Sequence, residues 1–149
     1  MRFISISMAS VAAIMMFAST ALAGTITVVP SSQLRNSKGT FRCALFSQSD
    51  GYPTEHGKAA LRVSAAITAE QSSCVFKDVP AGKYAVAVLH DENDNQMMDN
   101  HETGMPLEGF GASNDAQPGL MSPPKFKDAV IAVTDQPQRL SLLMRYYQL

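Results

Sequence analysis

The stretch Cys74–His90, CVFKDVPAGKYAVAVLH, holds the two clearest strand patterns of the chain with a turn between them. Both halves are rich in valine and aromatic residues, which favour strands. Between them Val79-Pro-Ala-Gly82 places proline at the second and glycine at the fourth position of a type I turn. The pattern predicts two antiparallel strands joined as a hairpin.

Strand patterns of the same kind lie on both sides of this stretch. Apolar residues alternate with polar ones, and clusters of Gly, Pro, Asn and Asp separate the segments. This spacing predicts an all-β chain that forms a single antiparallel β-sandwich, immunoglobulin-like, with about seven or eight strands. Thr54–Arg62 is expected to form only a helical turn or a loop. The further strand segments are Thr25–Val29, Thr40–Ser47, Arg62–Thr68, Asp128–Val133 and Arg139–Tyr147.

The first 23 residues have the features of a secretory signal peptide. Arg2 precedes an apolar stretch, and Ala21-Leu-Ala23 offers a cleavage site before Gly24. The stretch is short for a membrane span, and serines interrupt it. We expect residues 1–23 to be a signal peptide and residues 24–149 to be one β-sandwich domain, periplasmic or secreted, with no membrane span after cleavage. The formal net charge of −1 argues against nucleic acid as a partner.

Cys43 and Cys74 are the two cysteines of the chain. Paired thiols are the usual state in an oxidising compartment, and the wide spacing does not match a C-x-x-C redox site. We therefore predict a structural disulfide, with two buried free thiols or a redox pair as the alternatives. The bridge would close a loop of about 32 residues, for which the chain-entropy model gives about 3.7 kcal/mol.

The stretch His90–Glu102, HDENDNQMMDNHE, is similar to a calcium-binding loop. In the pattern D-x-[DN]-x-[DN]-G-x5-E, oxygen ligands come from alternate positions and from a final glutamate. Gln96 replaces the glycine of the sharp turn, and neither flank has a helical pattern. We predict weak calcium binding, with Kd on the order of 10⁻⁴ to 10⁻³ M; a solvated turn without a metal is the alternative. The predicted ligands are Asp91, Asn93, Asn95, the carbonyl of Met97, Asp99 and Glu102.

Asp91 to Lys125 has little strand character, which predicts a long ordered loop at one end of the sandwich. We expect an exported, non-enzymatic structural or binding module whose calcium-stabilised loop contacts a protein, a glycan or a small molecule. Serines lack a nucleophile motif, and no catalytic residue is assigned. The alternative is a periplasmic enzyme that uses loop carboxylates and His90 on a small molecule or the cell envelope. Residues expected to contact a ligand are His90, Glu108, Phe110 and Asn114.

Four segments in this order resemble a bacterial family catalogued as domain of unknown function 2141: LRNSKGTFRCALF, FKDVPAGKYAVAVLHDENDN, GMPLEGFGASN and PPKFKDAVIAV. The resemblance covers nearly the whole chain after the signal peptide. It implies export and a small sandwich of the transthyretin or carboxypeptidase-regulatory type, and it implies no activity. The family usually has glycine where this chain has Gln96 and a large apolar residue where it has Glu102. Cys43 and Cys74 stand where ordinary strand residues are common, so the bridge would be a local addition.

Overall fold

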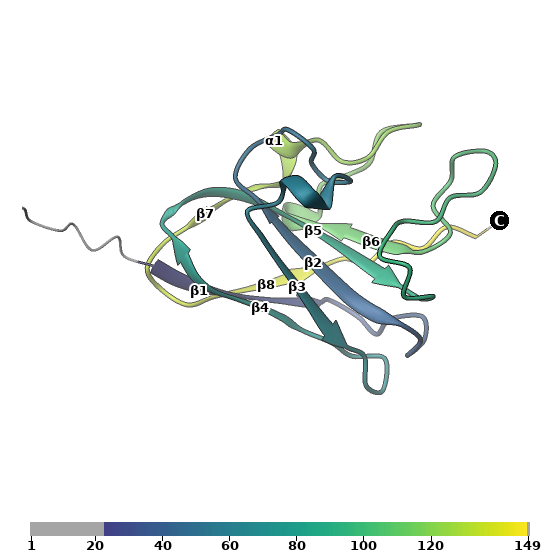
Figure 1. Ribbon diagram of the computed structural model, residues 1–149, viewed down its shortest axis with the longest axis horizontal. Coiled ribbons are helices and arrows are strands. Elements are labelled where there is room, and N and C mark those ends of the chain that lie inside the picture. Colours follow the sequence, from purple (N-terminus) through teal and green to yellow (C-terminus); the bar gives the residue numbers. More distant parts are fainter. Residues whose placement is uncertain (1–22, 149) are drawn as a thin grey trace, which may run out of the picture.

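The computed structural model describes residues 23–148, so the predicted signal peptide lies outside the described residues except for Ala23. Eight strands form two sheets that face one another, and only short helical turns interrupt them (Figure 1). The prediction of an all-β sandwich-like fold with about seven or eight strands is confirmed. Its elements are β1 (Ala23–Pro30), β2 (Thr40–Phe46), η1 (His56–Lys58), β3 (Leu61–Ala66), β4 (Cys74–Pro80), β5 (Gly82–Asp91), β6 (Gly109–Ala112), η2 (Ser113–Asp115), α1 (Phe126–Ala129), β7 (Val130–Val133) and β8 (Gln138–Leu142).

The smaller sheet has the strand order β4-β1-β8, and the larger one has β3-β2-β5-β6, with β7 also paired to β5. One strand pair departs from the predicted antiparallel arrangement, because β1 and β8 run parallel. Parallel neighbours need a long connection between them. Here almost the whole chain separates β1 from β8, and β8 enters the smaller sheet from β7 in the larger one, so no tight turn forces it to run against β1.

The predicted hairpin at Cys74–His90 is wrong. A reversal does occur at Pro80–Gly82, but β4 pairs with β1 in the smaller sheet, whereas β5 pairs with β2, β6 and β7 in the larger one. The turn therefore carries the chain from one layer to the other. Turn residues determine where the chain reverses. They do not determine whether the two flanking strands pair with each other or with other strands. Both strands bury apolar residues in the same core, from opposite sides.

The predicted loop over Asp91–Lys125 is interrupted by a strand. β6 has the sequence GFGA and pairs with β5, with Ala87 opposite Ala112 and Leu89 opposite Phe110. Glycine is usually unfavourable inside a strand, and the sequence rule therefore missed it. The remaining irregular parts are the acidic loop (residues 91–108) and the proline-rich segment (residues 116–125). Both project toward the right-hand side of Figure 1. The expected helical turn near Thr54 is η1, a single 3-10 turn.

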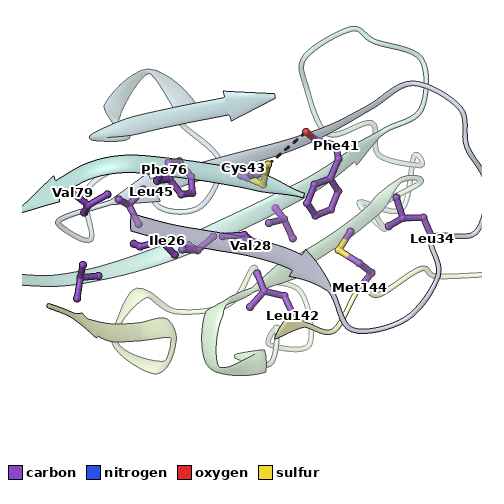
Figure 2. Packing of buried hydrophobic residues seen from close by; sticks show 14 residues of the cluster. Ile26, Val28, Leu34, Phe41, Cys43, Leu45, Phe76, Val79, Leu142 and Met144 are labelled. Carbon is purple, nitrogen blue, oxygen red and sulfur yellow. Dashed lines mark hydrogen bonds between the residues drawn. A yellow bond between two sulfur atoms is a disulfide. The ribbon is translucent and has the colours of Figure 1, made fainter. Parts of the chain in front are cut away.

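The core lies between the sheets and consists of side chains that alternate along the strands (Figure 2). Leu142 and Met144 point into it, as the alternation of the last segment predicts, and Leu140 packs against it. Cys43 of β2 and Cys74 of β4 form a disulfide with a Cα–Cα distance of 6.3 Å. The predicted pairing is confirmed, and the bridge ties one sheet to the other. Within residues 23–148 no helix is long and apolar enough to cross a membrane.

Candidate functional site

The acidic loop begins at a buried carboxylate. Asp91, the last residue of β5, has a fully buried side chain. One of its oxygens accepts a hydrogen bond from Nε of Arg42, on the neighbouring strand β2, in an ion pair. The backbone N–H groups of Asn95 and Gln96 also donate to this carboxylate, at 3.1 and 2.9 Å. A buried carboxylate is stable only when it is paired and hydrogen-bonded. Asp91 therefore anchors the first turn of the loop to the sheet.

The middle of the loop is held by side-chain amides. Oδ1 of Asn93 accepts the N–H of Asn95 at 3.2 Å, and Oδ1 of Asn95 accepts the N–H of Met97 at 2.9 Å. These are Asx turns, in which a short polar side chain bonds the backbone two residues further on. The carboxylate of Asp99 accepts the Nδ2 groups of Asn93 and Asn95, at 2.6 and 3.0 Å. Gln96 has φ of +69°, the left-handed conformation for which glycine is normally used.

Glu108 closes the loop at its other end. Its carboxyl group is buried and accepts the backbone N–H groups of Glu92 at 2.8 Å and Asp99 at 3.2 Å. Burial raises the pKa of Glu108, and the negative charges of Asp91 and Asp99 raise it further, although the two N–H donors act against this. Glu108, at the end of the loop, thus binds the backbone at the start of the loop and in its middle.

Glu92 has a different charge environment. Burial raises the pKa of its carboxyl group, but hydrogen bonds from Arg35 and from Asn36, the latter at 2.7 Å, bring the pKa below its ordinary value. Arg42 and Arg35 therefore supply positive charge at the base of the loop. The negative charges of Asp91 and Glu92 are thus balanced by arginines from β2 and from the segment before it.

The structure brings together four of the six predicted metal ligands. Asp91, Asn93, Asn95 and Asp99 belong to one hydrogen-bonded network. Glu102 is exposed and joins this network through no hydrogen bond among the described residues. Nowhere in residues 23–148 do three or more His, Cys, Asp or Glu side chains gather in a group that could hold a metal ion. The oxygens that remain for calcium are those of amides, backbone carbonyls and separate carboxylates.

The residues expected to contact a ligand have different surroundings. Nε2 of His90 lies 2.9 Å from the carbonyl of Lys38, to which it donates, and Nδ1 lies 2.8 Å from the hydroxyl of Tyr146. Because both ring nitrogens are used in the interior, His90 is a structural residue of β5. Asn114 donates to the carbonyl of Val130 at 2.7 Å and so also has a structural contact. Phe110 alone of the four expected residues lines a described cavity.

This cavity lies on the outer face of the larger sheet and has a volume of about 670 Å³. Along β5, Val86 and Val88 belong to the core between the sheets, whereas Ala85 and Ala87 face the other way. The floor consists of side chains from two rows of the sheet, and the walls come from three segments that are distant in sequence. The floor residues are Ala87, Leu89, Phe110 and Ala112; the walls include Pro53 and His56 of the β2–β3 connection, Met97 and Met98 of the acidic loop, and Pro118, Pro123 and Pro124 of the proline-rich segment.

The sequence contained one signal for this cavity. The run Ala85-Val-Ala-Val-Leu89 is apolar at every position, and a strand of that kind is covered on both faces. The signal indicates that something covers the second face. It does not identify the proline and methionine side chains that do so, because they come from loops without periodicity.

A family described as "Uncharacterized protein conserved in bacteria (DUF2141)" matches residues 29–141. The chain belongs to this family. The DUF2141 match extends from β1 to β8 and therefore includes both the acidic loop and the cavity. No curated protein and no solved structure matches the chain significantly. The transthyretin-like type of sandwich implied by the resemblance stays a prediction.

Proposed function

We propose that this DUF2141 protein is an exported, non-enzymatic binding module that holds a small, mainly apolar molecule in the cavity on the outer face of the larger sheet. The observation that carries the proposal is the cavity itself, with a volume of about 670 Å³ and a lining of alanine, leucine, phenylalanine, methionine and proline side chains. Binding sites for small molecules are typically concave, largely apolar, and on the order of 300–1,000 Å³.

The cavity has a structural origin. Ala44, Ala87 and Ala112 lie in one cross-strand row of the outer face, because Ala44 pairs with Ala87 and Ala87 pairs with Ala112. Ala87 and Ala112 line the cavity, and their small side chains lower its floor. Phe126 and Tyr52, which pack on the neighbouring residues Ala85 and Phe46, hold the covering segments above it. The cavity therefore exists because small alanine side chains lie below it and large aromatic side chains support the segments that cover it.

The acidic loop forms one wall of the same cavity. Gln96, Met97 and Met98 line it, and they lie between the anchor of the loop at Asp91 and the amide network around Asp99. Methionine side chains are flexible and polarizable and adapt to apolar ligands of different shape. In this proposal the ionic and amide contacts of the loop position two methionines at the edge of the ligand.

Export is supported by sequence and structure together. The signal-peptide pattern of residues 1–23 directs a chain out of the cytoplasm. The Cys43–Cys74 disulfide is a bond that persists in an oxidising compartment such as the periplasm. A module in that compartment would meet small molecules that enter from outside the cell or are released from the envelope.

Binding of the neutral fluorophore N-phenyl-1-naphthylamine tests this function. We expect one molecule to bind per chain with Kd on the order of 10 µM, from the usual affinity per ligand atom. Ala87→Leu raises the cavity floor and should weaken binding at least about tenfold, through a steric clash with the bound molecule. Ala132→Leu, on an exposed alanine of β7 that does not line the cavity, is the matched control. Equal binding by both variants, or none by the unmodified protein, would exclude the proposal.

Calcium binding by the acidic loop is a second proposal, favoured by its backbone. Asp91, Asn93 and Asn95 accept N–H groups in the manner of a loop curled around a centre, and Gln96 takes the left-handed conformation of the missing glycine. At 10 mM calcium and a Kd of about 1 mM, binding would stabilise the protein by about 1.4 kcal/mol. Thermal unfolding with calcium, with magnesium and with a chelator measures this shift. Asp99→Asn should abolish it, and an unchanged melting temperature in calcium would refute the second proposal.

A further inference from the structure

A second cavity adjoins the apolar one and has a different lining. It has a volume of about 300 Å³ and is lined by Arg42, Arg62, His56 and Ser64 among others. The two cavities share His56, Ala87 and Gln96, so they are parts of one continuous depression on the outer face of the larger sheet. One part of the depression is apolar, and the other carries two arginines and a histidine.

The register of the sheet explains this division. Ser64 of β3 lies opposite Arg42 of β2, which lies opposite Leu89 of β5, and Leu89 lies opposite Phe110 of β6. In the next cross-strand row on the same face, Arg62 of β3 lies opposite Ala44 of β2, Ala44 lies opposite Ala87 of β5, and Ala87 lies opposite Ala112 of β6. Both rows therefore begin with polar or cationic side chains at β3 and end with apolar ones at β6. The lining of the depression therefore changes from charged to apolar across the sheet because of the strand pairing, and the loops are not needed for this change.

The positive charges in this depression are not equally compensated. Arg42 pairs with Asp91, lies 3.8 Å from a carboxylate oxygen of Asp94, and donates to Ser64 at 3.1 Å. Arg62 makes no ion pair and no side-chain hydrogen bond with any residue in the range 23–148. Its guanidinium group is free to meet a ligand in the shared depression.

His56 is the titratable group beside these two arginines. Burial lowers the pKa of its imidazole, and the charges of Arg62 and Arg42 lower it further, although a backbone contact to Pro53 acts in the opposite direction. An acidic group bound beside these side chains would reverse the effect of the two arginines. At the boundary of the apolar cavity, an arginine without a partner among residues 23–148 therefore lies next to a histidine whose charged form is disfavoured.

We propose that the ligand of this site is an amphipathic anion: an apolar body occupies the larger cavity, and a single acidic group, a carboxylate or sulfonate, lies between Arg62 and His56. The inference rests on the proposed function and names the ligand class for the same site. A planar guanidinium group binds such oxyanions through paired N–H donors. Leu89, Phe110 and Met98 contact the apolar body in this arrangement.

Two probes with the same ring system test the inference. N-phenyl-1-naphthylamine is neutral, and 8-anilino-1-naphthalenesulfonate is the same molecule with a sulfonate group. Titrated into the purified protein at low ionic strength, the sulfonate should bind at least about tenfold more tightly, since a charge-assisted hydrogen bond with an arginine adds to apolar burial. Addition of salt should narrow the difference, because the charges are partly exposed to solvent.

Variants separate the head-group contact from the apolar contact. Arg62→Gln should reduce sulfonate affinity at least about tenfold and leave the neutral probe unchanged. Arg139→Gln, on the exposed side of β8 in the smaller sheet, removes the same charge without touching either cavity and should change neither affinity. The thermal stability of both variants should equal that of the unmodified protein, because Arg62 has no ion-pair or hydrogen-bond partner among residues 23–148 to lose.

The outcomes distinguish this inference from the proposed function. If the neutral probe binds in the cavity and the sulfonate binds no more tightly, or if Arg62→Gln and Arg139→Gln behave alike, the anionic ligand class is refuted and the apolar cavity stands. If neither probe binds, both proposals fall. Tight sulfonate binding that is lost in Arg62→Gln and in Ala87→Leu supports both.

Discussion

Replacement of Asp91 by asparagine is the sharpest test of how the acidic loop is held. The carboxylate is fully buried and accepts hydrogen bonds from Arg42, Asn95 and Gln96. Asparagine removes the charge and turns an N–H₂ group toward at least one of these donors. Arg42, whose side chain is 21% exposed, then keeps only its hydrogen bond to Ser64 and its distant contact with Asp94. Loss of one partner of a buried ion pair costs about 3–5 kcal/mol, and we expect about 3 because Arg42 is partly hydrated.

Urea unfolding followed by far-ultraviolet circular dichroism measures this loss. With an m-value of about 1.5 kcal/mol per molar urea, Asp91→Asn should lower the unfolding midpoint by about 2 M. The control is Asp94→Asn, whose carboxylate is 56% exposed and lies 3.8 Å from the same arginine. An exposed pair at that distance contributes at most about 0.5 kcal/mol. Hydrogen exchange of the Asn95 and Gln96 amides should also become faster in Asp91→Asn, since these groups lose their acceptor.

A double-mutant cycle with Arg42→Gln separates the ion pair from the backbone contacts. Because the two side chains are in direct contact, the summed loss of free energy of unfolding in the two single variants should exceed the loss in the double variant by about 1–3 kcal/mol. The reasoning is refuted if Asp91→Asn is as mild as Asp94→Asn, or if the coupling with Arg42 is absent. In that case the loop would be held by its amide network alone.

Three further predictions follow from other parts of the fold. Replacement of both Cys43 and Cys74 by alanine should lower the free energy of unfolding by about 3.7 kcal/mol, and a reducing agent should destabilise the unmodified protein by a similar amount while leaving the variant unchanged. Gly109→Ala should lower the free energy of unfolding by about 1–3 kcal/mol, since the new Cβ would lie 2.1 Å from the ring of Tyr146. Gly57→Ala is the control and should leave the stability unchanged, because no atom lies within 4 Å of the new Cβ. Equal effects of the two substitutions on unfolding would show that the Tyr146 ring moves aside without loss of stability. Because the pKa of His56 is lower in the folded than in the unfolded state, its contribution to stability is present above about pH 6.5 and is lost as the pH falls. The stability difference between the unmodified protein and His56→Gln should therefore shrink between about pH 7 and 5 in chemical unfolding, and a constant difference would contradict the lowered pKa.

The strands were predictable because a half-buried strand leaves a period of two in the sequence. The segment that ends in Leu140, Leu142 and Met144 shows this, since the alternating residues do face the core. β6 was not predictable in this way. Gly109 and Gly111 lie in it because other parts of the chain approach the backbone closely, at the Tyr146 ring and at the Leu143 carbonyl. Those approaches are tertiary contacts, which no local pattern contains.

The sequence also did not predict which strands would pair with one another. A type I turn between two strand patterns is compatible with a hairpin and with a crossing from one sheet to the other, and the structure has the crossing. The decision depends on which neighbour covers more apolar surface, and that is determined by the whole fold. The same holds for the parallel pair of β1 and β8, whose strands are separated by almost the whole described chain.

The candidate site combines features that the sequence showed separately. The charges of the acidic loop predicted a cation site, but its buried contacts with Arg42 and Glu108 are directed inward and hold the backbone. The chain between those contacts carries Met97 and Met98 to the edge of the cavity. The cation that neutralises Asp91 is also one of the residues that line the polar end of the depression. The acidic loop and the depression are therefore connected through Arg42. Its guanidinium group pairs with Asp91, which holds the loop, and it also lies near Arg62 in the polar part of the depression. A substitution at Arg42 should accordingly change both loop stability and anion affinity, whereas substitutions at Asp91 and Arg62 should separate the two.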